Sequence, residues 1–538
     1  MEPHRHLQGN SSVAENQNFE NSENDLENQS SPFNAPAIAE LAKTPNKREP
    51  LSVGGMIAWL VIVLVMGSMI VLTALSRAGE EAQTEANSSD LFPVQLQGRS
   101  IVGQKAFLGT KKKEVKEEEG EEDEKPRKRS GTPVPEALND GTYEQRLCYV
   151  LLINENNGSE EASEKLSELD EKAEEAGFEK NEDQEKLRYI VGTVIDSHQQ
   201  GDMDAEPLTD DEREWLKTKL GWIGELALAP EGTRNKETRK ELLAEASWAM
   251  GMMMTMVLLG LLTLMGGVGL AALFAVLFGT GKLKPKFTTR GKSTNIYIET
   301  FALWMVVFFV GPQLVAVAIK MASIEMSPNV NMLITMGIFL GSLIVLIYPV
   351  MRGISFKQVR EDIGWTAKEG FVDIFVSPIN YVAGMPLMVC GMICVVVLTV
   401  ISGLFVAEKP FGTGIAAGHP IQDVFAGGEW FSIATMIFMA CVAAPIVEET
   451  MFRGVLYRHL RELSTNWARW GSVIFSAVFN GLIFAAIHPQ GFVAIPLLTC
   501  LAVSFSLARE WRDSLIAPMI MHGINNGSVT AVMLLMMA

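Results

Sequence analysis

Residues 430–457 read WFSIATMIFMACVAAPIVEETMFRGVLY, an apolar run that ends in two adjacent glutamates, with an arginine four residues beyond the second. A membrane core of roughly 30 Å needs about 20 apolar residues in helical form. The run over Trp430–Val447 comes close to that length, so it predicts a membrane helix with carboxylates at one end. Ionisable groups within such helices are costly and usually functional.

Similar apolar runs recur along the chain, which has 538 residues, 48% of them hydrophobic. Hydropathy predicts about nine spans. They are Gly54–Leu75, Trp248–Leu277, Phe301–Ile319, Val330–Val350, Gly384–Val406, Trp430–Val447, Trp470–Ile487, Gly491–Ala508 and Ser514–Met537. The predicted fold is an all-α, polytopic membrane helix bundle, with one N-terminal span, an eight-span core and an α-helical polar insert.

The chain divides into four parts. Residues 1–50 are rich in Asn, Ser, Glu and Pro, and we expect them to be disordered because they bury too little apolar surface. The first span occupies 51–77 and a polar insert 78–247. The membrane core occupies 248–538, with its chemical motifs in 430–538.

The polar insert carries much of the acid behind the net charge of −18. A charge block from Lys111 to Arg129 predicts a solvated linker up to about residue 130. Beyond it, Thr209 and Glu212 form a capping-box pattern, and a helical domain is expected. Its other helices are predicted over Tyr143–Asn154, Ser163–Ala176 and Asp183–His198. An acidic solvated domain does not favour nucleic acid, and a protein partner outside the membrane fits it better.

Lysine and arginine alternate in density between successive loops. They gather in 282–292, 352–368, 453–469 and 509–512, and are sparse in the loops between. Since basic loops face the cytoplasm, the N-terminus is expected inside, and the insert and the C-terminus outside. We expect a multi-pass protein of a bacterial plasma membrane, in contact with membrane lipid.

The two glutamates have different neighbours on a helix. Glu449 and Arg453 are spaced i, i+4 and can pair on one face. Glu448 is rotated about 100° away and is free to face elsewhere. The pair is therefore not expected to share one proton as a carboxylate dyad.

Two histidines complete the polar set. Phe484 and His488 end the seventh predicted span, and His522 and Asn526 share a face within the ninth. Such a set suits peptide hydrolysis, because a carboxylate in a low dielectric becomes a useful general base for water. A histidine can hold that water or protonate the leaving amine, and a His–Asn pair can stabilise an oxyanion. One Glu and two His are equally the ligands that zinc takes.

These three motifs, in this order and each on an apolar span, resemble the CPBP family. Its members are the CAAX-prenyl-protease and bacteriocin-processing intramembrane peptidases, also called the Abi family. The resemblance covers roughly residues 290–538 and is densest after Trp430. It implies an intramembrane endopeptidase that acts on a membrane-associated protein or peptide.

The resemblance implies a role for each matching residue. Glu448 would activate water, assisted by His488, while His522 and Asn526 would stabilise the oxyanion. The supporting residues would be Glu449 and Arg453. The family is often described as metallopeptidases, and a divalent metal such as zinc would take Glu448, His488 and His522. A metal-free glutamate mechanism is favoured here because no further strong ligand such as Cys is evident.

Two other functions are compatible with the pattern. One is a non-catalytic membrane scaffold or immunity-type binding protein of the same fold, and the other is a transporter with a proton relay. Complete motifs disfavour the first, and the lack of evident inverted repeats disfavours the second.

The predicted span ends place Glu448 and His488 on opposite faces of the bilayer. Chemistry needs them close, so the sixth helix is expected to continue past Arg453 through Tyr457. The segment 488–491 is expected to form a buried bend. A separation above about 12 Å would contradict a shared reaction.

The remaining candidates are predicted to be structural. His419 and His459 are expected in solvated loops, and Glu299 at the membrane interface. The five cysteines contain no CxxC pair and are expected to be small core side chains without disulfides.

Overall fold

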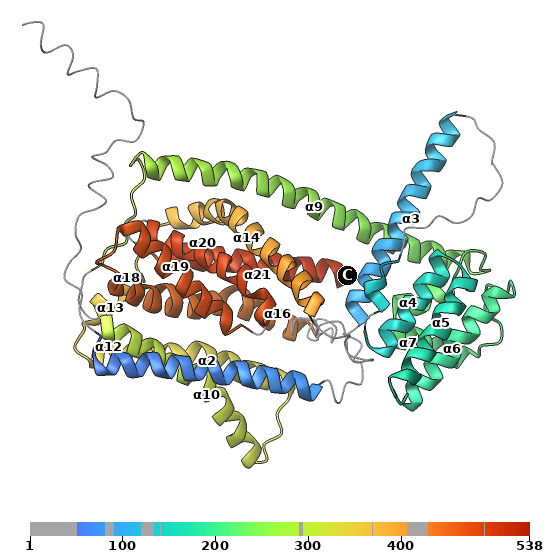
Figure 1. The fold of residues 1–538 in the computed structure, drawn as a ribbon, viewed down its shortest axis with the longest axis horizontal. Helices are drawn as coiled ribbons and strands as arrows, with labels where there is room; N and C mark the ends of the chain where they lie inside the picture. The colour runs from blue at the N-terminus through green and yellow to red at the C-terminus, as the bar shows by residue number, and fades with distance from the viewer. Residues whose placement is uncertain are drawn as a thin grey trace, which may run out of the picture.

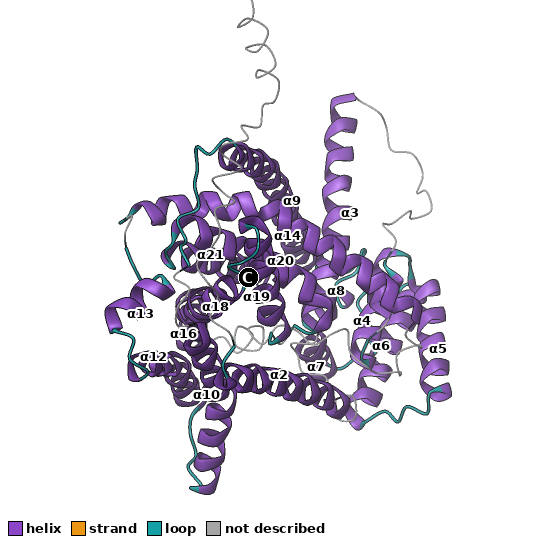
Figure 2. Cartoon of the chain, turned by 60° about the vertical axis from the view of Figure 1, so that its left-hand side comes forward, coloured by secondary structure: helices purple, strands orange, loops and turns teal. Residues whose placement is uncertain are grey.

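The computed structural model describes residues 51–80, 91–119, 134–139, 141–289, 294–367, 370–405, 429–488 and 490–537. Within these ranges the regular elements are all helices (Figures 1 and 2), which confirms the all-α class. The predicted disorder of 1–50 and the predicted loop position of His419 lie outside the described residues.

Among the described residues, eight helical stretches are long and apolar enough to cross a membrane, so the chain is an integral membrane protein. They are Val53–Leu72, Lys236–Gly279, Asn295–Met321, Pro328–Met351, Val372–Ile401, Trp430–Leu463, Arg469–Ala486 and Phe492–Arg512. The ninth predicted span is present as helix α21 (Ile516–Met537) but is not among the eight. Its histidine and two asparagines lower its hydropathy, and they are the residues that point to chemistry.

The membrane helices lie side by side along one direction, and the insert lies beyond one end of them (Figure 1). α14 (Val372–Phe405), α19 (Arg469–Ala486), α20 (Ile495–Arg512) and α21 form one packed group. The first span, α2 (Val53–Glu80), packs against α10 (Thr294–Met321) on another side.

One helix joins the insert to the membrane part. α9 (Lys236–Gly279) has 44 residues, about 66 Å at 1.5 Å per residue, which is about twice the thickness of the hydrocarbon core. Leu242 and Ala246 near its start are buried in the core of the insert. Gly267 further along lets α9 approach the backbone of α14, because an added Cβ would lie 2.4 Å from the carbonyl oxygen of Val382.

The described part of the insert consists of helices around an apolar core of its own. Its helices are α4 (Tyr143–Asn156), α5 (Ser159–Glu175), α6 (Glu182–Gln199), α7 (Asp210–Leu220) and α8 (Trp222–Ala227). The predicted capping box of Thr209 and Glu212 opens α7, and two further capping boxes open α4 and α6. Each reciprocal cap satisfies two backbone donors that the first turn leaves free.

The segment predicted as a charged linker is helical where it is described. α3 (Phe92–Glu119) packs against α9, and its apolar residues Val94, Ile101 and Val102 are buried in the core of the insert. The linker prediction rested on the charge block and overlooked the apolar residues before it. Residues 120–130 lie outside the described part.

The stretch 430–463 forms one continuous helical span. It consists of α16 (Trp430–Phe438), a π-helical turn (Met439–Ala443), α17 (Ala444–Glu449), a second π-helical turn (Thr450–Leu456) and α18 (Tyr457–Leu463). The prediction that this helix continues through Tyr457 is confirmed. π-helical turns are rare and often accompany functional sites, and here they flank the two glutamates.

Candidate active site

The two glutamates face different partners, as their spacing predicted. Glu449 accepts a hydrogen bond from Arg453 Nη1 at 3.0 Å, and both side chains are fully buried. The Nδ1 atom of His522 lies 2.8 Å from the same Glu449 oxygen. The buried Glu449 carboxylate therefore pairs with Arg453 on its own helix and joins that helix to α21 through the His522 imidazole.

Aromatic rings enclose this buried pair. The Arg453 guanidinium lies 4.5 Å from the ring centre of Phe484 and 5.3 Å from that of Phe505, while Phe505 stacks on the His522 imidazole. Cation–π contacts strengthen when the cation is out of water. The rings thus hold both Arg453 and His522 in fixed positions.

Glu448 faces the two histidines instead. Its Oε2 atom lies 3.8 Å from His488 Nε2 and 3.9 Å from His522 Nε2, well inside the 12 Å limit set from the sequence. This oxygen is buried and has no hydrogen-bond partner among the described residues. Polar atoms separated by more than 3.5 Å are commonly bridged by water, so the spacing suits a small group held between all three.

The other ring nitrogens of the two histidines are already engaged. His488 Nδ1 lies 2.6 Å from the carbonyl oxygen of Phe484, which can only accept, so this nitrogen carries the proton. His522 Nδ1 faces the Glu449 carboxylate. Because each Nδ1 atom is fixed in this way, each Nε2 atom is directed at Glu448.

Asparagine amides contact both π-helical turns. Asn526 Nδ2 donates to the carbonyl oxygen of Ala440 at 2.8 Å, within the first turn. Asn480 Nδ2 donates to the carbonyl oxygen of Phe452 at 2.8 Å, within the second. One amide hydrogen of Asn526 is therefore committed to the backbone.

Asn480 was missed by the sequence reasoning. It lies within α19, eight positions before His488, and is fully buried. A buried polar residue in an apolar span was the available signal, but it has no place in the three motifs. Asn525, next to Asn526, accepts from the hydroxyl of Tyr381 at 3.3 Å.

Two expectations about histidines need correction. His459 is not in a solvated loop: it is fully buried in α18 and lies 3.3 Å from the indole nitrogen of Trp59, because the helix continues where a loop was expected. The chain does bend after α19, at His488, but Gln490 is exposed, so the bend is not buried throughout. Pro489 lies outside the described residues.

Glu299 and the cysteines have structural surroundings. Glu299 forms an ion pair with Arg352 and accepts from the Tyr348 hydroxyl at 2.8 Å. The five cysteines are free thiols, but Cys390 and Cys394 are exposed, so the prediction that all five are core side chains is wrong for these two.

The candidate active site contains side chains that could bind a metal ion. Glu448, His488 and His522 are of the ligand types that zinc takes, and both histidines have an ordered second partner, as metal ligands do. Within the described ranges, however, no three His, Cys, Asp or Glu side chains are grouped closely enough to hold an ion.

Fold and site together define a polytopic membrane protein with a glutamate and two histidines gathered between its helices. Residues 430–528 match the model of the family described as type II CAAX prenyl endopeptidase Rce1-like. This match confirms, over residues 430–528, the resemblance inferred from the motifs.

Two curated proteins are similar to parts of the chain. The membrane-embedded CAAX protease MroQ of Staphylococcus aureus (strain USA300) is 34% identical over 103 residues, which are 19% of this chain and 41% of that protein. An uncharacterized 24.3 kDa protein of Escherichia coli is 29% identical over 143 residues, 26% of this chain and 59% of that protein. The chain thus spans less than two thirds of either relative. No solved structure matches it.

Proposed function

We propose that this protein is an intramembrane endopeptidase that hydrolyses a peptide bond of a membrane-associated protein or peptide. The observation that carries the proposal is the position of the Glu448 carboxylate, within 3.8 and 3.9 Å of two imidazole Nε2 atoms. The match of residues 430–528 to a family of membrane endopeptidases supports it.

In the proposed reaction, water sits between Glu448 and His488. The Glu448 carboxylate takes one proton as the water oxygen attacks the scissile carbonyl carbon, and the carbonyl π electrons move to its oxygen. His488 Nε2 accepts a hydrogen bond from the same water and orients it. The Glu448 carboxyl then gives its proton to the leaving amine as the C–N bond breaks, which restores the carboxylate.

The tetrahedral intermediate carries a negative oxygen that needs donors. When protonated, His522 donates from Nε2 while its Nδ1 stays on Glu449. The amide hydrogen of Asn526 that is not bound to Ala440 is the second proposed donor. Donors fixed before the reaction stabilise an oxyanion at little reorganisation cost, and Glu449 with Arg453 provides that fixation.

The arrangement of basic loops supports a proposed orientation. The basic segment 282–289 and α13 (Phe356–Ile363) lie at the end of the bundle away from the insert (Figure 1). With basic loops inside, the N-terminus is cytoplasmic, and the insert lies outside, where it has room for a protein partner. The proposed location is the plasma membrane of a bacterium.

A cleavage assay in reconstituted vesicles tests the proposed activity. Wild type, Glu448→Gln and His522→Ala are compared on a library of membrane-associated peptides, with Glu299→Gln as a matched carboxylate-to-amide control. We expect cleavage by wild type and the control and none by the other two. Unchanged cleavage by Glu448→Gln would refute the mechanism, and no cleavage by wild type would favour a scaffold function. Retention of activity after chelation separates the metal-free reaction from a zinc-dependent one.

A further inference from the structure

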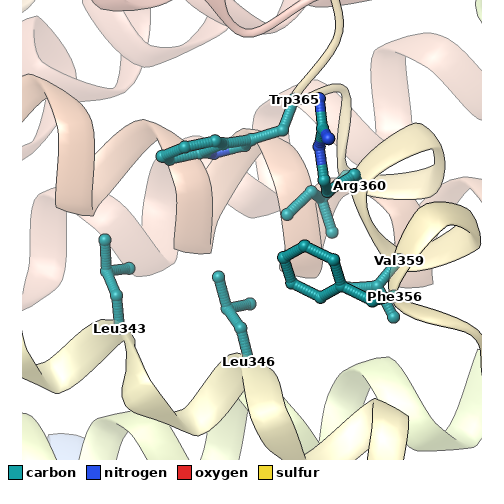
Figure 3. Close-up of a pocket in the computed structure, with 7 residues that line it drawn as sticks. Leu343, Leu346, Phe356, Val359, Arg360 and Trp365 are labelled. Atoms are coloured by element: carbon teal, nitrogen blue, oxygen red, sulfur yellow. The ribbon is translucent and has the colours of Figure 1, made fainter.

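A mostly apolar cavity of about 410 Å³ lies between the fourth span and α13, a volume within the usual range for ligand pockets. Figure 3 shows Leu343 and Leu346 pointing toward the Trp365 indole, with Phe356 and Val359 at one side and Arg360 beside Trp365. Its full lining is Leu343, Leu346, Phe356, Val359, Arg360, Ile363 and Trp365. None of these residues belongs to the candidate active site.

The surroundings of the cavity are those of a membrane surface. Ile344 and Ile347, next to the lining leucines, expose 66% and 52% of their surface and face the space that lipid occupies in a bilayer. Phe356 and Trp365 are exposed at the other edge, as aromatic residues at a membrane interface are. The cavity is therefore accessible to lipid.

The rim of the cavity carries one positively charged side chain, Arg360. The Arg360 guanidinium is exposed and makes no hydrogen bond or ion pair with the side chains that the structure describes. Arg352, one short loop away, is in contrast paired with Glu299. Arginine binds phosphate oxygens through two parallel hydrogen bonds, so Arg360 is placed to take an anionic group at the mouth of an apolar pocket.

The wall of the cavity is fixed to the protein core. α13 ends at Gly364, whose φ of 87° suits glycine and turns the chain sharply. The Gly364 carbonyl accepts from the Leu515 backbone at 2.9 Å, and the Asp362 carbonyl accepts from Arg509 at 3.2 Å. Residues 362–365, here called the elbow, therefore cannot shift without disturbing the membrane core.

The elbow also touches the helix that carries the glutamates. The Trp365 indole nitrogen donates to the hydroxyl of Thr450 at 2.9 Å, directly after Glu449. Ile363 lies so close to Gly454 in the second π-helical turn that an added Cβ would lie 3.1 Å from it. Trp365 and Ile363 also line the cavity. A single layer of side chains therefore separates a ligand in the cavity from the helix of 430–463.

We propose that this cavity binds an anionic phospholipid, with one acyl chain among its leucines and aromatic residues and the phosphate on Arg360. The bound chain packs against the face of Trp365 and holds its contact with Thr450. The lipid thereby stabilises the second π-helical turn and the position of Glu449. A free phosphate does not satisfy this site, because the lining offers almost only apolar surface.

Lipid retention tests the binding without reference to catalysis. The full-length protein is purified in detergent, mixed with phosphatidylglycerol or with phosphatidylcholine of the same chains, and analysed by native mass spectrometry. We expect phosphatidylglycerol to be retained at least fivefold more than phosphatidylcholine by wild type. Arg360→Gln should remove the preference, and Leu346→Trp, which fills the cavity, should reduce retention of both lipids. Lys357→Gln, on the exposed side of the same helix, should behave as wild type.

Three results would overturn the proposal. They are equal retention of both lipids by wild type, loss of retention in Lys357→Gln as large as in Arg360→Gln, and displacement of the lipid by inorganic phosphate. Unchanged melting temperatures of the variants without lipid show that they fold.

The effect of the lipid on the helix of 430–463 rests on the proposed function. Phosphatidylglycerol vesicles should raise the cleavage rate of wild type but not that of Arg360→Gln. If only this cleavage experiment fails, the proposed effect of the lipid on this helix is contradicted and the proposed lipid-binding site is not.

Discussion

The insert and the membrane core bury different kinds of residues. The core of the insert is made of Leu, Ile, Val and a few aromatic side chains, and capped helices enclose it. The membrane core also buries apolar side chains, and in addition it buries ion pairs such as Arg453–Glu449 and Arg461–Glu510. Between membrane helices the surrounding lipid is as apolar as the side chains, so polar contacts and close packing provide the specificity that apolar burial provides in water. A substitution should therefore act through different forces in the two regions.

Arg453→Met should have the largest effect on stability. It removes the cation from a pair with no solvent exposure and leaves Glu449 buried beside His522 alone, which typically costs about 3–5 kcal/mol. Thermal unfolding in detergent measures the loss. The double variant Glu449→Gln with Arg453→Met removes both charges and should recover part of it; no recovery would show that packing against Phe484 dominates.

Leu147→Ala should act on the insert alone. Leu147 is fully buried in α4, and truncation of such a leucine costs about 2–5 kcal/mol. Hydrogen exchange should speed up in α4 to α8 and stay unchanged in α19 to α21. Equal acceleration in both regions would contradict their separate stabilisation.

The insert should also respond to acid through one histidine. Burial lowers the pKa of His198 from 6.5 to about 4, and its Nδ1 atom lies 2.8 Å from the Asn154 amide. Between pH 6.5 and 4 the unfolded insert binds more protons than the folded one, so its stability falls as the pH falls through this window, by about 3 kcal/mol in all. Hydrogen exchange of α4 and α6 at pH 7 and pH 5 measures the trend, and His198→Gln should flatten it.

Asn480→Ala should give the smallest of these effects. It leaves the Phe452 carbonyl in the second π-helical turn without its side-chain donor, at about 1–3 kcal/mol. We expect a small drop in melting temperature and a larger loss of cleavage, because the turn follows the glutamates. Asn331→Ala on an exposed part of the fourth span serves as the control. An unchanged cleavage rate in Asn480→Ala would show that the turn does not position the site.

The same contrast explains what could be predicted from the sequence. The capping box at Thr209 and Glu212 is a local rule, and the structure follows it. Hydropathy placed Glu448 and His488 on opposite faces of the membrane. Their proximity was predicted only because a shared reaction requires the two side chains to lie close together. Hydropathy ended the span at Val447 because charged residues follow, whereas ion pairs keep those residues inside the bundle.

Other features depend on contacts that no local pattern contains. The π-helical turns shift the register of the helix by tertiary contacts, including those of Asn480 and Asn526 with backbone carbonyls. His459 is buried because the first span brings Trp59 to it across 400 positions of sequence. Polar residues in apolar spans predicted which residues matter, and the three-dimensional packing decided how they are paired.

The two adjacent glutamates offer the most direct test of the account. Glu448→Gln and Glu449→Gln are each a single carboxylate-to-amide change, and both cleavage rate and melting temperature are measured for each. Glu448→Gln should lower the cleavage rate by about 10²–10⁴-fold with the melting temperature nearly unchanged, whereas Glu449→Gln should lower the melting temperature as well. Undiminished cleavage by Glu448→Gln, with Glu449→Gln inactive but stable, would contradict the assignment of the base to Glu448.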